Sequence, residues 1–190
     1  MSNTFLILSI IVGIISPIIG ITSVLKGNFN PQRMTRFLIM LVSFLFVGTL
    51  FANGDTNGIY LASAQLLGSM AMFYLSLKRG IGGNTRLDWT VFAMAIGSLI
   101  VWQTTNIAFL GLVMSIVTDF IGFVPTLVKT WKYPETEEWK FYMSDVVASF
   151  FSILSIAVFS LHNLAFPIYI FLINMTSVVM ILGRKKYLSK

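Results

Sequence analysis

Residues 107–128 read IAFLGLVMSIVTDFIGFVPTLV, a run in which Asp119 is the single charged residue. A bilayer core about 30 Å thick requires roughly 20 apolar residues of helix for one crossing. The run is therefore long enough to cross a membrane, and it places a carboxylate near the middle of the crossing. This pattern predicts a membrane-spanning helix with a polar group at its centre.

Further apolar runs lie on both sides of this segment. Residues 89–128 are too long for one crossing, and the polar string Gln103-Thr104-Thr105-Asn106 divides them. Residues 141–183 are divided at His162-Asn163, with Pro167 soon after, where a chain can leave and re-enter a helix. Together with the runs 1–25, 37–54 and 56–77, these segments predict an all-α membrane protein with seven transmembrane helices.

The composition agrees with a membrane protein. Of 190 residues, 56% are apolar and 11% are charged, whereas a typical soluble domain has about 25% charged residues. The net charge of +6 would suit a nucleic-acid partner, but the mean hydropathy of +0.85 leaves too little polar surface for one. With no Cys and one His, the chain offers little for a metal site or for hydrolytic chemistry. We therefore expect no enzyme activity, no metal and no cofactor.

The basic residues indicate the orientation. All 13 Lys and Arg fall in the connections after the first, third and fifth predicted helices or in the C-terminal tail. Because short basic loops are retained in the cytoplasm, we expect an inner (plasma) membrane protein with its N-terminus outside and its C-terminus in the cytoplasm. Trp89, Trp131 and Trp139 lie at the predicted cytoplasmic boundary and Trp102 near the outer one, as in an interfacial aromatic belt.

The two halves of the chain share a pattern. Pro17 precedes Gln65 by 48 residues, and Pro125 precedes Asn174 by 49. Each spacing joins a proline in the first helix of a predicted bundle to an amide in its third helix. Duplicated bundles are frequent in transporters. We expect two parallel three-helix bundles, residues 1–78 and 107–190, the second with a basic cytoplasmic tail, joined by a loop and linker helix over residues 79–106.

Two loop segments carry a family resemblance. DFIGFVPTLVKTWKYPETE, residues 119–137, resembles the Pro-Gln-loop (PQ-loop) superfamily, which includes the SWEET sugar transporters, their half-sized bacterial relatives and lysosomal amino-acid exporters. LKGNFNPQRMTR, residues 25–36, is similar to the matching loop of the bacterial members. The resemblance covers nearly the whole chain in topology. It implies a fold of three helices, a linker helix and three helices, and it implies solute transport.

The resemblance also implies roles for individual residues. Pro17 and Pro125 match prolines that act as hinges, and Asn174 matches an Asn that binds solute. A proline within a helix removes a backbone hydrogen bond and kinks the helix, which a rocking bundle can use. Thr126 follows Pro125 where the family has Gln, and Gln65 stands where the family has Asn. Sugar specificity therefore stays open.

Asp119 is the first candidate for function. A carboxylate at the bilayer centre costs roughly 3 kcal/mol on insertion scales and is normally kept for function. Spacings of four, three and four place Ser115, Asp119, Gly122 and Thr126 on one helix face, which we expect to meet a polar cavity. We expect Asp119 and Ser115 to bind solute and Asp119 to exchange a proton during transport. The alternative is a neutral carboxyl that only bonds to a neighbouring helix.

Other polar residues are weaker candidates. Asp145 suits proton coupling, but an acid near a helix N-terminus also has a structural use. Ser149 and Ser152 continue its stripe, and we expect Ser149 to bind solute. Asn174 and Gln65 can donate and accept hydrogen bonds to a solute, or to a neighbouring helix instead. The acidic run 135–138 suits a solvated loop or a cytoplasmic gate that pairs with basic loops.

These patterns favour a transporter that moves a small polar solute, such as a sugar or amino acid, by alternating access. Its expected partners are that solute and the lipid bilayer; a homo-oligomer is left open. The alternative is a non-transporting seven-helix receptor or signalling protein, since one fold serves several functions. A retinal pigment is excluded because residues 164–183 contain no lysine. The predicted spans also lack paired acids, a His-rich motif and an activated nucleophile, which disfavours an intramembrane enzyme.

Overall fold

The computed structural model describes residues 2–52, 58–104, 108–156 and 161–188. This part of the chain forms seven α-helices and one 3-10 turn, and it contains no β-strand. The all-α prediction is confirmed. The elements are α1 (Ser2–Leu25), α2 (Arg33–Ala52), α3 (Gly58–Arg79), α4 (Arg86–Thr104), α5 (Ala108–Lys132), η1 (Pro134–Thr136), α6 (Trp139–Ser155) and α7 (Leu161–Leu188).

Several helices extend beyond the apolar runs that predict them. α2 starts at Arg33 rather than near residue 37, and α5 continues to Lys132. The predicted break at His162-Asn163 is wrong in position, because α6 ends at Ser155 and α7 already begins at Leu161. The first N–H groups of a helix have no acceptor within it, so polar residues are tolerated in the first turn.

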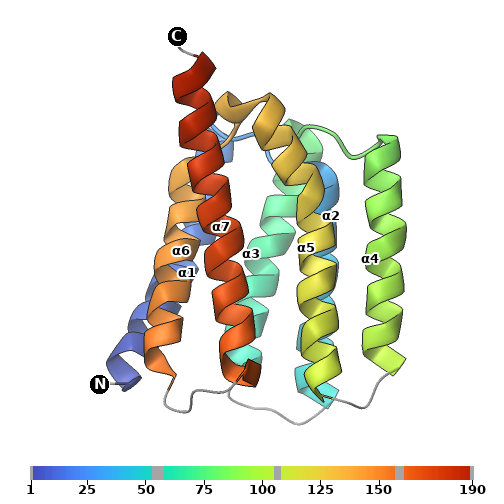
Figure 1. Cartoon of the computed structure of the whole chain (residues 1–190), viewed down its shortest axis with the longest axis vertical. Coiled ribbons are helices and arrows are strands. Elements are labelled where there is room, and N and C mark those ends of the chain that lie inside the picture. Colours follow the sequence, from blue (N-terminus) through green and yellow to red (C-terminus); the bar gives the residue numbers. More distant parts are fainter. Residues whose placement is uncertain (1, 53–57, 105–107, 157–160, 189–190) are drawn as a thin grey trace.

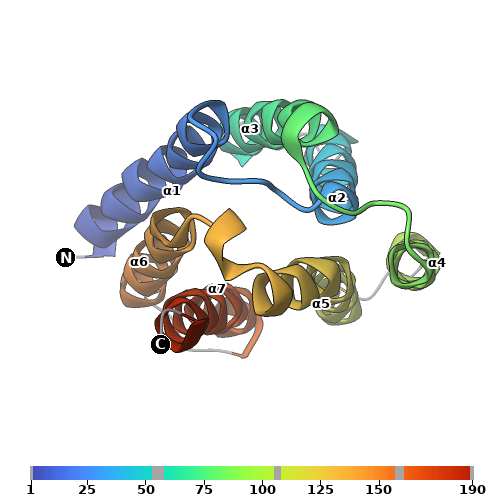
Figure 2. The ribbon, with the colours of Figure 1, turned by 90° about the horizontal axis from the view of Figure 1, so that it is seen from above.

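The helices lie side by side in two rows (Figures 1 and 2). In the first row α3 lies between α1 and α2, and in the second row α7 lies between α6 and α5. The rows meet where α1 packs against α6 and where α2 packs against α5. α4 packs against α5 at the end of the second row, with a smaller contact to α2.

The C-terminus and the connections α1–α2, α3–α4 and α5–α6 lie at one end of the helices, which we name the basic end (Figure 1). The start of α1 lies at the opposite end. Two of the described helices contain segments long and apolar enough to cross a membrane, Thr4–Leu25 and Leu164–Leu188, with mean hydropathies of 2.5 and 2.1. These segments support membrane association by length and composition.

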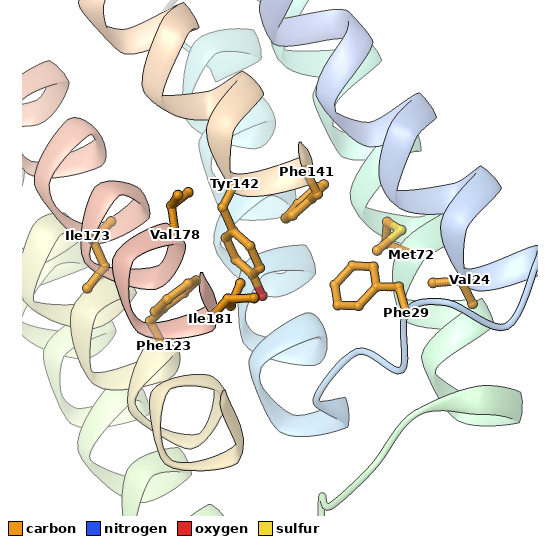
Figure 3. Packing of buried hydrophobic residues seen from close by; sticks show 9 residues of the cluster. All are labelled: Val24, Phe29, Met72, Phe123, Phe141, Tyr142, Ile173, Val178 and Ile181. Atoms are coloured by element: carbon orange, nitrogen blue, oxygen red, sulfur yellow. The ribbon is translucent and has the colours of Figure 1, made fainter. Parts of the chain in front are cut away.

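A buried apolar cluster fills the space between the rows toward the basic end (Figure 3). Tyr142 and Phe29 are completely buried in it, and Phe141 packs against both rings. Five helices, α1, α3, α5, α6 and α7, and the α1–α2 loop contribute its buried residues: Val24, Phe29, Met72, Phe123, Phe141, Tyr142, Ile173, Val178 and Ile181. The cluster joins the two rows at this end.

Gln32 fixes the start of α2. Its side-chain oxygen accepts a hydrogen bond of 2.7 Å from the backbone N–H of Thr35, as a capping group does. Its side-chain nitrogen donates to the Asp88 carboxylate at 2.6 Å. Asp88 also accepts from the backbone N–H groups of Gly83 and Thr85, so one buried carboxylate ties the starts of α2 and α4 together.

Candidate functional site

A cavity of about 550 Å³ lies between the two rows of helices. We call it the central cavity. Its lining residues come from α1, α2, α3, α5, α6 and α7. Most are apolar, and the polar ones are Ser9, Ser16, Arg36, Ser43, Ser69, Asp119, Asp145, Ser149, Ser152 and Asn174. An apolar wall with a few polar groups is typical of a site for a small molecule.

Asp119 lies on the wall of the central cavity and is partly buried. Its carboxylate accepts a hydrogen bond of 2.6 Å from the Tyr169 hydroxyl, which comes from α7. The sequence pattern does not single out Tyr169, because an aromatic residue in an apolar helix is normally a packing residue. This hydrogen bond holds the Asp119 carboxylate on the side of α5 that faces α7.

Gly122 and Thr126, two other positions of the predicted Asp119 face, pack on α2 rather than on the cavity. The Thr126 hydroxyl donates to the Thr35 hydroxyl at 2.9 Å, and Thr35 donates to the Gly122 carbonyl at 2.7 Å. A Cβ atom on Gly122 would come within 3.2 Å of Leu38, so α2 and α5 approach closely here. The expectation that Gly122 and Thr126 meet a polar cavity is therefore wrong, because a neighbouring helix covers them.

Asp145 also lines the central cavity, from α6. Ser16 lines the cavity from α1, and its hydroxyl donates to the Phe141 carbonyl of α6 at 3.4 Å. Ser149 and Ser152 line the cavity along the same helix, as their spacing predicts. The Ser149 hydroxyl donates within α6, to the carbonyls of Asp145 and Val146.

Arg36 is a cavity residue that the sequence pattern places among the basic loop residues. It lies one turn inside α2, and its side chain is only 6% exposed. Its guanidinium lies 4.8 Å from the ring centre of Phe141 and 5.6 Å from that of Phe29. It interacts electrostatically with both Asp119 and Asp145. Arg36, Ile39 and Ser43 all line the cavity, and their spacing places them on one face of a helix. This spacing could have identified Arg36 as a cavity residue if the predicted helix had begun at Arg33.

The other predicted site residues divide into three groups. Asn174 lines the cavity, and its side-chain nitrogen donates to the Ile170 carbonyl of its own helix at 2.9 Å. Pro17 also lines the cavity, whereas Pro125 is buried within α5 and is not among the lining residues described. The side chains of Gln65 and Ser115 lie outside the described residues.

At the basic end, a buried ion pair connects α5 to the α5–α6 connection. Lys129 and Glu137 approach to 2.5 Å, and Glu137 also accepts a hydrogen bond of 2.7 Å from the Tyr142 hydroxyl. Lys129 additionally donates to the backbone carbonyl of Asn30, in the α1–α2 loop. Burial lowers the pKa of the Lys129 ammonium, and the Glu137 carboxylate opposes this shift. Part of the predicted solvated acidic run is thus buried and paired.

Comparison with protein-family models, with curated proteins and with solved structures found no match to this chain. Among the described residues, no group of three or more His, Asp and Glu side chains is placed to hold a metal ion. The structure itself defines an all-α protein with a mainly apolar cavity between two rows of helices, in which two carboxylates, one guanidinium and one amide are gathered.

Proposed function

We propose that this chain is an integral membrane transporter that moves a small polar solute through the central cavity by alternating access. The observation that carries the proposal is the placement of Asp119, Asp145 and Asn174 around one cavity between two sets of helices. Solute-binding sites of this kind lie between the repeated units of transporters, near the middle of the membrane.

The outer surface of the helices supports a membrane location. Every one of the seven described helices carries large apolar side chains that are exposed, among them Ile7, Phe44, Leu67, Met94, Phe120, Phe150 and Val179. A water-soluble monomer rarely exposes so much apolar surface, whereas lipid tails solvate it without cost. We assign seven spans in the plasma membrane, with the basic end and the C-terminus in the cytoplasm and the N-terminus outside.

The packing of the helices supports an origin by duplication. The first set of helices is α1, α2 and α3, and the second set is α5, α6 and α7. In each set the third helix lies between the other two: α3 between α1 and α2, and α7 between α5 and α6. The first helix of each set packs against the second helix of the other: α1 against α6, and α5 against α2. Two parallel copies related by an axis along the membrane normal would have this pairing. The proposed units are residues 1–78 and 107–190, with α4 as the linker.

The basic end supplies a candidate gate. The apolar cluster joins the two rows there, the Lys129 ammonium donates to the Asn30 carbonyl across them, and the Asn30 backbone N–H donates to the Thr136 carbonyl across them at 2.9 Å. The cavity lining instead reaches Leu6 near the start of α1 and Phe166 near the start of α7. In our proposal this conformation is closed toward the cytoplasm, and transport requires these contacts to separate.

Asp119 and Asp145 are the proposed proton and solute groups. A carboxylate taken out of water favours its neutral form, and a cavity that opens to one side and then to the other lets a proton enter and leave. Pro17, on the cavity wall of α1, and Pro125, within α5, are the proposed hinges. Both interrupt the backbone hydrogen bonds of long helices.

The test is solute flux through purified protein in liposomes. Sugars, amino acids, nucleosides and vitamins are offered with and without a pH gradient, and empty liposomes serve as the blank. Flux of at least one polar solute that falls in Asp119→Asn and persists in the surface variant Glu135→Gln supports transport. Tight binding of a ligand without flux of any solute contradicts transport and supports the receptor alternative.

A further inference from the structure

Arg36 is a charged residue buried at the wall of the central cavity. Within the described residues, no ion pair includes Arg36, and its Nε atom has no hydrogen-bond partner. Arginine is almost never this deeply buried unless it is paired, because leaving water costs the charged group several kcal/mol. A position of this kind requires a specific reason.

The acids that interact with Arg36 do not bond to it. Asp119 accepts a hydrogen bond from Tyr169, and both Asp119 and Asp145 act on Arg36 only through electrostatic interaction. Lys129, also close enough to interact with Arg36, has the same sign of charge. The two acids therefore lower the electrostatic cost of burying Arg36 without bonding to its donors, whereas Lys129 raises that cost.

The aromatic contacts leave the guanidinium donors available. Phe141 and Phe29 pack against one another in the apolar cluster (Figure 3). The Arg36 guanidinium lies near both rings. An aromatic face attracts the flat face of a guanidinium, whereas the five N–H groups point outward in the guanidinium plane. Because Arg36 also lines the central cavity, a bound solute can reach this edge.

We infer, on the basis of the proposed transport function, that Arg36 binds the carboxylate of the transported solute. The planar fork of a guanidinium matches a carboxylate through two parallel hydrogen bonds. A neutral sugar would leave the buried charge unpaired. The solute class is therefore a small organic acid, either an amino acid or a hydroxy or keto acid.

The opposite charges in the cavity distinguish an amino acid from a hydroxy or keto acid. Asp119 and Asp145 line the same cavity of about 550 Å³ and offer carboxylate oxygens to a solute that also carries an ammonium group. An amino acid would use both signs of charge, whereas a hydroxy or keto acid would use Arg36 and the hydroxyl groups. In both cases the carboxylate is the group that Arg36 recognises.

The experiment measures dissociation constants and ligand-induced thermal shifts of the purified full chain in detergent. The probes are the standard L-amino acids, L-lactate, pyruvate, D-glucose and L-alaninol, which is alanine with an alcohol in place of the carboxylate. Arg36→Gln removes the charge, and Arg36→Lys keeps it without the fork. Lys78→Gln, an exposed lysine at the same end that does not line the cavity, is the matched control.

At least one carboxylate probe should bind the wild-type chain and the Lys78→Gln control equally. Loss of a charge-assisted hydrogen bond should weaken that binding about tenfold or more in Arg36→Gln. The dissociation constant of Arg36→Lys should lie between those of the wild-type chain and Arg36→Gln, which would show that the weaker binding is not caused by misfolding. L-alaninol should not compete with the carboxylate probe. Equal binding by Arg36→Gln, binding of D-glucose alone, or no binding of any carboxylate probe overturns the inference.

Flux in liposomes separates this inference from the proposed function. If a carboxylate probe binds and its binding requires Arg36, but the probe shows no flux, the result supports the binding site and contradicts transport. Flux of D-glucose without carboxylate binding keeps transport and contradicts the role of Arg36.

Discussion

The Tyr169 hydroxyl donates a hydrogen bond of 2.6 Å to the Asp119 carboxylate and so joins α7 to α5 at the wall of the central cavity. Both helices belong to the same row, so the bond can persist while the rows move against each other. The second oxygen of Asp119 remains available to a solute or a proton. This geometry combines a fixed position for the carboxylate with access from the cavity.

Asp119→Asn should remove any dependence of uptake on pH, because an amide cannot take up and release a proton in this range. The measurement is initial uptake into liposomes across a series of external pH values. Glu135→Gln, which removes an exposed carboxylate away from the cavity, should keep the wild-type profile. An unchanged profile in Asp119→Asn would remove Asp119 from proton coupling.

Tyr169→Phe should lower the free energy of unfolding by about 1 kcal/mol, since buried hydrogen bonds in membrane proteins are individually modest. A double-mutant cycle with Asp119→Asn isolates the contact from the loss of either group alone. The measurement is unfolding in mixed detergent micelles. A coupling energy of zero would show that the two groups do not depend on each other.

Gly20→Ala should destabilise the contact between α1 and α6. A Cβ atom at Gly20 would lie 2.9 Å from the Phe141 ring, so that the ring or the helix has to shift, at a cost of about 1 to 3 kcal/mol. The midpoint of thermal unfolding reports the effect. Gly97→Ala in α4 is the matched control, because a Cβ atom there meets nothing within 4 Å. Equal midpoints for the two variants would argue against close packing at Gly20.

Glu137→Gln should be strongly destabilising, because it leaves the Lys129 ammonium without its counter-charge. Breaking a buried pair from one side typically costs about 3 to 5 kcal/mol. The double variant Lys129→Met with Glu137→Gln should recover much of this loss, since no unpaired charge remains. Chemical unfolding of the wild-type chain and the two variants provides the measurement, and a double variant no more stable than Glu137→Gln would contradict the paired arrangement.

The helical class and the approximate helix positions could be predicted because an apolar run indicates a helix without reference to its neighbours. Helix ends were harder to predict, since α2 begins in the charged segment before its apolar run and α5 continues past its apolar run into another. The face shared by Asp119, Gly122 and Thr126 follows from periodicity, but periodicity does not reveal which neighbour covers each position. Here α2 covers Gly122 and Thr126, while Asp119 lies on the cavity wall.

Arg36 and Glu137 show a second limit of prediction from the sequence. Counting charges assigns every basic or acidic residue near a helix end to a solvated loop. The structure instead buries Arg36 against Phe141 and buries Glu137 against Lys129 and Tyr142. These burials depend on aromatic residues and on partners distant in the sequence, and local composition does not contain that information.

The most direct test of alternating access is the accessibility of the cavity from each side of the membrane. The chain has no cysteine, so a single cysteine at Ser149, on the cavity wall, is the only thiol in the protein. A membrane-impermeant thiol reagent is applied to oriented vesicles from one side or from the other. Alternating access predicts that Ser149→Cys reacts from both sides and that a cross-link across the basic end abolishes reaction from the cytoplasmic side alone. Reaction from only one side under every solute and pH condition would contradict it.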